Sequence, residues 1–130
     1  MTQPYDKVAE TGWWGSVVFV GHSDGSVPAL EYLDTLVSQA QGQFAVRAEK
    51  LAAAGRISNE EQFKKITDDN KTPAIWEIKL SPGPGYRFYC WQEGRVWFVC
   101  HGTQKPRGNK GYQPEIKRAR AVYESRRRKS

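Results

Sequence analysis

The sequence predicts an α+β fold, in which helices pack on one face of a small, mainly antiparallel sheet. Two observations lead to this class. Three strand-like runs follow one another closely between residues 75 and 101, separated by short turns that contain glycine. Segments with helical spacing of apolar residues precede these runs, and one more follows them. The predicted order is β-α-α-β-β-β-α, within a single domain that spans residues 1–130.

The first half of the chain is expected to hold one strand and two helices, with a short third helix behind them. The strand spans residues 13–20 and ends at a turn. A helix capped by Ser26 continues to Gly42, and a second helix runs from there to the stop signal Gly55. The capping-box pattern at 58–61 predicts a short helix through residue 66, followed by a loop at 68–73.

Two hairpins and a final helix are expected in the second half. The predicted strands span 75–80, 86–91 and 95–101, and the last helix covers 114 to about 127. The five-residue loop after Leu80 pairs that residue with Tyr86, and a turn at Glu93-Gly94 pairs Gln92 with Arg95.

The two sheet faces that follow from this register differ in polarity. One face is nearly all apolar and should form the core under the helices. On the other face Lys79 lies opposite Arg87, and facing like charges destabilise a sheet. Either a diagonal ion pair between Glu77 and Arg87 offsets this repulsion, or the face is a basic pocket for phosphate. We favour the pocket, with Tyr89 and Trp91 available to stack bases.

The two cysteines indicate a reducing compartment. In the predicted register Cys90 and Cys100 face opposite sides of the sheet, so we expect free, buried thiols and a cytoplasmic protein. With only two histidines besides, a four-ligand metal site is not supported. No apolar run approaches the roughly 20 residues of a membrane span.

The basic charge is concentrated at the C-terminal end. Residues 1–100 carry ten Lys/Arg against twelve Asp/Glu, whereas residues 101–130 carry ten against two, so the whole net charge of +6 originates there. Such a field attracts nucleic acid. The predicted contacts are Arg107 and Lys110 in a loop at 102–112, and the tail residues Arg126, Arg127 and Arg128. The alternative is a solvated basic helix with a loose tail, within 114–130.

Several short motifs, taken in order, resemble the RelE/ParE toxin superfamily, and in particular its HigB-like, phage-associated branch. The resemblance covers about residues 28–124. The motifs are Phe63-Lys-Lys-Ile66, Ile75-Trp-Glu-Ile-Lys-Leu80, Gly85-Tyr-Arg-Phe-Tyr89, His101-Gly102 with the lysine-bearing loop after it, and Pro114-Glu-Ile-Lys-Arg-Ala119.

The resemblance implies the toxin of a type II toxin–antitoxin pair, a RelE-like fold, and cleavage of mRNA on the ribosome without a metal ion or cofactor. It also implies an antitoxin partner, often a small helix-turn-helix protein in this branch. By position, Arg87 corresponds to the family arginine and Lys105 to the family lysine, with Arg107 or Lys110 as possible helpers. Tyr112 corresponds to the family tyrosine. The loop at 103–113 is longer than the usual one, which leaves the choice of lysine open.

Cleavage by attack of the ribose 2′-OH needs a base, a cation for the charge on the phosphorane, and an acid for the leaving 5′-oxygen. Arg87 is expected to balance the phosphate charge, and Lys105 or Lys79 to supply charge or transfer a proton. Tyr112 is expected to act as acid, base or stacking platform. His101 is expected to have a structural role.

Two other functions remain open at this level. A non-enzymatic, gyrase-inhibiting toxin of the same fold would stall replication rather than shorten transcripts. A phage nucleic-acid-binding accessory protein would depend on the basic C-terminal segment alone, with a strong dependence of affinity on salt.

Overall fold

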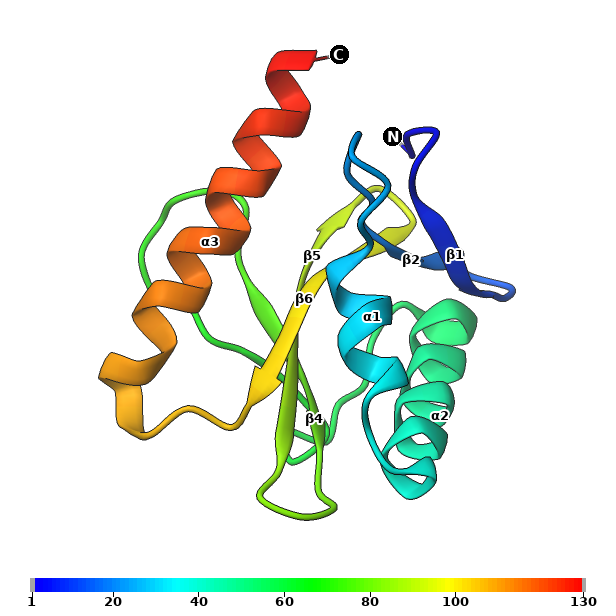
Figure 1. Ribbon diagram of the computed structural model, residues 1–130, viewed down its shortest axis with the longest axis vertical. Helices are drawn as coiled ribbons and strands as arrows, with labels where there is room; N and C mark the ends of the chain where they lie inside the picture. The colour runs from blue at the N-terminus through cyan, green and yellow to red at the C-terminus, as the bar shows by residue number, and fades with distance from the viewer. Residues whose placement is uncertain (1, 130) are drawn as a thin grey trace.

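A six-stranded mixed sheet organises the part of the chain that the computed structural model describes, residues 2–129 (Figure 1). Its strands are β1 (Lys7–Thr11), β2 (Ser16–Phe19), β3 (Phe63–Lys65), β4 (Trp76–Leu80), β5 (Tyr86–Glu93) and β6 (Val96–Gln104). The helices are α1 (Pro28–Asp34), α2 (Ser38–Ala54) and α3 (Gly108–Lys129). The predicted α+β class is confirmed.

The strands lie in the order β1-β2-β6-β5-β4-β3. Strands β2 and β6 are parallel, and every other neighbouring pair is antiparallel. Neither edge strand, β1 or β3, was among the predicted strands. The central strands β5 and β6 carry apolar residues on both faces, so the sheet has to be covered on both sides.

The helices are divided between the two faces of the sheet, and α3 lies on the side opposite to α1 and α2 (Figure 1). One core joins Phe44 and Leu51 of α2 to Phe88 and Trp97. The other joins Ile116 and Ala119 of α3 to strand residues that include Tyr89, Trp91 and Phe98. This corrects the expectation that all helices pack on one face of the sheet, because α3 covers the other face.

The first half of the chain departs from the predicted elements. Gly42 lies inside α2, because the helix break occurs earlier, at 35–37, and Val27 rather than Ser26 precedes α1. Gly55 does end α2, as expected, with a left-handed φ of 78°. The short helix predicted through residue 66 is wrong. Phe63 is buried there in strand β3, where its ring stacks on Trp76 at 4.8 Å, so tertiary packing outweighs the local capping pattern.

One hairpin register is confirmed and the other is shifted. In β4 and β5, Leu80 pairs with Tyr86 and Lys79 with Arg87, as predicted. In β5 and β6, Gln92 pairs with Trp97 instead of Arg95, and an irregularity interrupts the ladder after Tyr89. His101 therefore lies on the α3 face rather than on the predicted core face, with its ring 4.9 Å from that of Tyr89.

The cysteine prediction is confirmed despite the shifted register. Cys90 belongs to the core under α1 and α2, and Cys100 belongs to the core under α3. Both thiols are free and buried. Burial raises the pKa of Cys100 to about 12, so this thiol stays protonated and unreactive at neutral pH.

Helix α3 begins at Gly108, earlier than the predicted start at Pro114, which lies inside the helix. Most of the predicted basic loop is therefore the end of β6 or the first turn of α3. Polar contacts tie the helix to the rest of the chain: His101 Nε2 to Glu115 Oε1 at 2.9 Å, Arg120 to Asp69 at 2.7 and 2.8 Å, and Arg126 to Asp6 at 2.9 and 3.0 Å. No helix within residues 2–129 is long and apolar enough to cross a membrane.

Candidate functional site

A cleft of about 430 Å³ lies where strands β3, β4 and β5 approach the end of β6 and the first turns of α3. Its charged and phenolic residues are Lys64, Lys65, Asp68, Glu77, Lys79, Arg87, Lys105 and Tyr112. A second cavity of about 250 Å³ shares Lys79, Arg87 and Lys105 with it. Five cations face two carboxylates in the cleft, so this concave surface attracts anions.

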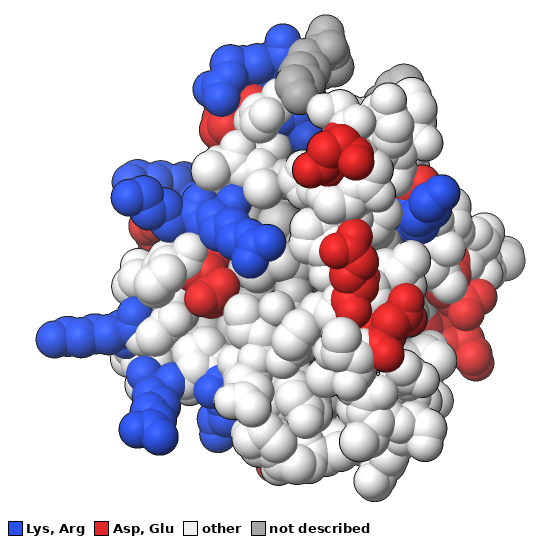
Figure 2. Space-filling model, viewed as in Figure 1, with Lys and Arg blue, Asp and Glu red and all other residues white. Residues whose placement is uncertain are grey.

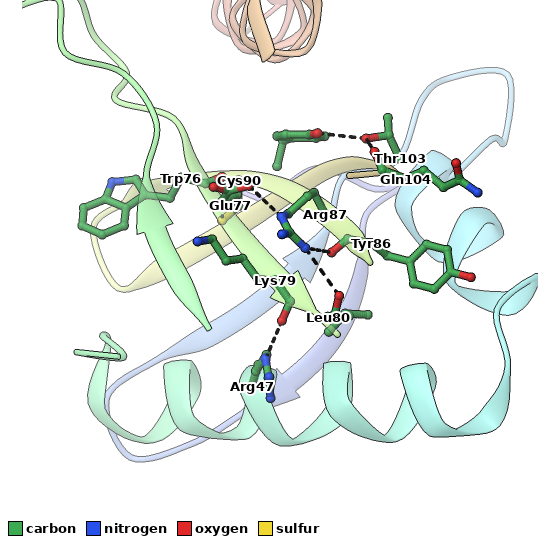
Figure 3. A network of polar contacts seen from close by, with 11 residues as sticks. Arg47, Trp76, Glu77, Lys79, Leu80, Tyr86, Arg87, Cys90, Thr103 and Gln104 are labelled. Atoms are coloured by element: carbon green, nitrogen blue, oxygen red, sulfur yellow. Dashed lines mark hydrogen bonds and ion pairs between the residues drawn. The ribbon is translucent and has the colours of Figure 1, made fainter. Parts of the chain in front are cut away.

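Arg87 and Glu77 form a buried pair at the base of the cleft (Figure 3). Arg87 Nε lies 3.1 Å from Glu77 Oε1, which is within ion-pair distance. The two atoms do not have the geometry of a hydrogen bond. Arg87 Nη1 also donates to the carbonyl oxygens of Tyr86 at 2.9 Å and Leu80 at 3.4 Å. These contacts hold the guanidinium in one orientation.

The Glu77–Arg87 pair is the diagonal ion pair that the sequence analysis ranked below the pocket. It offsets the repulsion between Lys79 and Arg87, which are cross-strand partners in the β4–β5 ladder. The pocket is present as well, because both cations line the cleft. The two explanations therefore describe one arrangement, in which Glu77 pairs with Arg87 while Arg87 and Lys79 both line the cleft.

Tyr112 lies in the wall of the cleft that α3 provides. Burial raises the pKa of its hydroxyl, and so do the charge of the Glu77 carboxylate and a hydrogen bond with it, while Arg87 acts in the opposite direction. The phenol is therefore protonated at neutral pH and is suited to donate a proton rather than to accept one.

Main-chain contacts fix the backbone at Lys79 and Lys105, two of the four lysines that line the cleft. Arg47 Nε of α2 donates to the carbonyl oxygen of Lys79 at 2.7 Å. Lys105 N donates to Gly85 O at 2.9 Å, which brings the end of β6 to the β4–β5 loop. Gly85 has a left-handed φ of 85°, so a larger residue at this turn would be strained. Both lysine side chains thus extend toward the cleft from a fixed backbone.

The structure brings together four of the predicted site residues, namely Arg87, Lys79, Lys105 and Tyr112. It does not bring Arg107 and Lys110 into the cleft. Both are exposed, Arg107 just before α3 and Lys110 in its first turn.

Tyr89 and Trp91 cannot stack RNA bases in this structure, and that expectation is wrong. Both side chains are fully buried, at 0% exposure, between the sheet and α3. The Tyr89 hydroxyl lies 2.8 Å from the Thr103 hydroxyl, and the Trp91 indole N–H donates to Glu93 at 2.7 Å. The sequence analysis took their face as open because it did not place α3 over it.

The basic tail lies at the opposite end of α3 from the cleft (Figure 1). Arg126 is buried, with its guanidinium on Asp6 and 5.0 Å from the Phe98 ring, so its predicted role in RNA binding is corrected to a structural one. Arg127 lies 5.6 Å from the ring of Tyr123, and Arg128 is exposed. Figure 2 shows basic side chains along the side of the molecule that α3 occupies.

His101 has the structural role that was expected. Its side chain is 1% exposed and its Nε2 contacts Glu115. Burial and the nearby charge of Arg118 lower its pKa to about 4, against the effect of Glu115, so the imidazole is neutral at pH 7.

Four charged residues of the cleft were missed as site residues: Lys64, Lys65, Asp68 and Glu77. Asp68 was assigned to a loop. The two lysines were assigned to a short helix, and Glu77 was considered only as a structural partner. The sequence Phe63-Lys-Lys-Ile66 gives no clear strand signal, because its apolar residues stand three apart, as in a helix, although lysines do suit an exposed edge strand. Lys64 pairs with Glu77 across the β3–β4 ladder, and Lys65 pairs with Trp76.

Comparison with family models found one match. The family is described as phage-derived protein Gp49-like (DUF891), and its model matches residues 31–124 of the 130-residue chain. All residues of the cleft lie within the matched segment. Comparisons with curated proteins and with solved structures gave no match.

Proposed function

The chain belongs to the phage-derived Gp49-like family, a family of RelE-like toxins, and from this membership we propose a ribosome-dependent mRNA endonuclease. The family is associated with toxins of toxin–antitoxin systems, which implies an antitoxin partner. We propose that the chain is of the HigB-like type, acts in the cytoplasm without a metal ion or cofactor, and is neutralised by a small helix-turn-helix protein.

The observation that supports cleavage is the cleft that joins Arg87, Lys79, Lys105 and Tyr112. A phosphodiester placed against Arg87 would have cations on two sides, which stabilise the charge that develops on the phosphorane. The guanidinium is already oriented by Glu77 and two carbonyl groups, so little reorganisation is needed when the phosphate binds.

In the proposed reaction the ribose 2′-oxygen attacks the adjacent phosphorus, and the bond from phosphorus to the 5′-oxygen breaks. Tyr112, protonated at neutral pH, donates its proton to the leaving 5′-oxygen. Glu77 is our candidate for the group that accepts the 2′ proton. Its carboxylate is ion-paired with Arg87 and lines the same cleft as Tyr112, so the proton would remain among groups that surround the phosphate.

The role of Glu77 can be separated from a general effect of charge. Glu77→Gln keeps the shape of the side chain but removes the proton acceptor, and we expect cleavage to fall about 100-fold. Asp68→Asn is the matched control, because it removes the other carboxylate that lines the cleft. Equal activity of both variants with the wild type would exclude Glu77 as the base.

The proposed activity is tested by incubating mRNA with the purified protein, with and without programmed ribosomes, and by reading the cuts by primer extension. We expect cuts only with ribosomes. Cuts on naked RNA would keep a nuclease but remove its dependence on the ribosome. No cuts in either sample, with a protein shown to be folded, would contradict the proposal and favour a gyrase inhibitor or a simple nucleic-acid-binding protein.

A further inference from the structure

A separate cavity of about 320 Å³ lies on the other side of strand β3 from the catalytic cleft. Its lining includes Arg56, Glu60, Phe63 and Trp76, together with the two lysines of β3 that also line the cleft. The proposed cleavage reaction leaves this cavity without a role. Three cations and one carboxylate give it a positive charge, like that of the cleft.

The indole of Trp76 is half-buried and lines this cavity. The Phe63 ring stacks on the indole with a centroid distance of 4.8 Å and an interplanar angle of 17°. The Arg56 guanidinium carbon lies 5.8 Å from the centroid of the same ring system. Trp97 makes a T-shaped contact with the same indole at 5.7 Å, so the Arg56 guanidinium lies over ring surface that neither Phe63 nor Trp97 occupies. Arg56 is exposed, so its long side chain can move aside without disturbing the core.

Strand β3 connects the two cavities. Lys64 is the cross-strand partner of Glu77, in the cleft, and Lys65 is the partner of Trp76. Successive side chains alternate between the faces of a strand, so the two lysines point to opposite sides of β3. The strand forms the edge of the sheet and takes up only about 4.8 Å of its width. In Figure 3 the indole of Trp76 lies apart from Glu77 and Arg87, on the far side of the labelled cluster.

We propose that the cavity between Arg56 and Trp76 binds a nucleobase of single-stranded RNA that flanks the phosphate in the cleft. The base displaces Arg56 and stacks on the indole surface that Arg56 now covers, while Lys64 and Lys65 contact the phosphates that cross the edge of β3. Stacking on an aromatic ring accepts any base, so this subsite adds affinity and register rather than sequence preference. The inference rests on the proposed function for the identity of the ligand.

The test uses short 2′-O-methyl RNA oligomers, which the protein cannot cleave by 2′-OH attack, and measures their affinity by fluorescence anisotropy. One base at a time is removed to leave an abasic position. For the wild type we expect one position at which the loss of the base weakens binding about 5- to 150-fold, the range of one base–aromatic stack. In Trp76→Leu this penalty disappears, and in Trp76→Tyr, which keeps an aromatic face, most of it returns.

Trp76→Leu also removes a ring from the core, so its thermal unfolding is measured in parallel. If this variant does not fold, Arg56→Glu replaces it, because that exposed position can carry a carboxylate over the ring without a change in the core. Arg56→Glu is then expected to weaken the intact oligomer at least as much as the abasic change does. An abasic penalty of the same size in wild type and Trp76→Leu, or no affinity of any oligomer for the wild type, overturns the proposal.

Failure of this subsite can be distinguished from failure of the proposed function. If wild-type protein cuts mRNA on ribosomes but the Trp76-dependent penalty is absent, the subsite is wrong and the nuclease stands. If the penalty is present but no RNA is cut, the subsite stands as part of a binding protein and the proposed chemistry is wrong.

Discussion

The two ends of helix α3 lie in different charge environments. Toward the C-terminal end, Arg120 and Arg126 are engaged by Asp69 and Asp6, and the N-terminal segment and the 67–75 loop are tied to the helix through them. At the N-terminal end, Tyr112 faces a cleft in which the cations outnumber the carboxylates. One end is therefore a structural clamp, and the other borders the candidate site.

This difference shows that the position of charge in the sequence is a poor guide to the site. The last 30 residues hold the whole net positive charge of the chain. Not all of these cations are available to a ligand, because Arg126 is buried in an ion pair with Asp6. Four of the five cations in the cleft, Lys64, Lys65, Lys79 and Arg87, come from strands outside that basic segment, and Lys105, the residue after β6, belongs to it. A cation becomes functional when the fold places it beside others around a cavity.

The largest effect is expected at the open end of α3. Tyr112→Phe removes the proposed proton donor and keeps the ring, so we expect the rate of mRNA cleavage to fall about 100- to 10,000-fold. Primer extension over a time course on programmed ribosomes measures this rate. Tyr123→Phe is the matched control, because Tyr123 packs in the core near the other end of the same helix. A similar loss in both variants would mean that the loss of a tyrosine hydroxyl anywhere on α3 lowers activity, and that Tyr112 has no specific role as proton donor.

The second largest effect is expected at the ion pair between Asp6 and Arg126, near the C-terminal end of α3. Asp6→Ala leaves Arg126 buried without its carboxylate partner, and the free energy of unfolding should fall by about 3–5 kcal/mol. Urea denaturation followed by tryptophan fluorescence measures the change. Asp24→Ala, in an exposed turn, is the control and should change stability little. An Asp6→Ala protein as stable as the wild type would mean that the ion pair does not hold the N-terminal segment on α3.

A smaller effect concerns pH. His101 has a pKa of about 4 in the folded protein, below its ordinary value near 6.5, because it is buried. The unfolded chain therefore takes up a proton first as the pH falls, and the free energy of unfolding should decrease between pH 6.5 and about 4. Denaturant titrations at a series of pH values should show this decrease in the wild type and a weaker one in His101→Phe. The same slope in both would assign the pH dependence to other groups.

The smallest effect separates the cleft from the tail in RNA binding. Lys79→Gln should weaken binding of a 2′-O-methyl oligomer several-fold and lower the slope of log affinity against log salt by about 0.7, the value for one contact on a single strand. Arg128→Gln, at the far end of α3, should leave both quantities nearly unchanged. The reverse result would place the RNA on the basic tail.

Much of the sheet could be predicted from the sequence, because the β4–β5 hairpin depends on local signals. The loop after Leu80 and the alternation of the flanking strands set the pairing of Lys79 with Arg87, and so the core of the site. The edge strand β3 could not be predicted in this way, because a capping-box pattern precedes it and only its packing on Trp76 and Trp97 makes it a strand.

The position of α3 is the second feature of the fold that could not be predicted from the sequence. The sequence shows that the final helix is amphipathic, but it does not show which face of the sheet the helix covers. Tyr89 and Trp91 therefore seemed available to RNA, although α3 buries them. The irregularity after Tyr89 also moves His101 to the α3 face, and no local signal in the sequence marks that position.

The most direct test of the account is Arg87→Lys. Lysine keeps a positive charge near Glu77 but loses the planar guanidinium that Glu77 and the carbonyl groups of Tyr86 and Leu80 orient. Cleavage of mRNA on programmed ribosomes is measured for this variant and for Arg95→Lys, an exposed arginine at the β5–β6 turn. We predict a loss of about 100-fold or more for Arg87→Lys and none for Arg95→Lys. Full activity of a folded Arg87→Lys protein would contradict the assignment of the cleft as the site of cleavage.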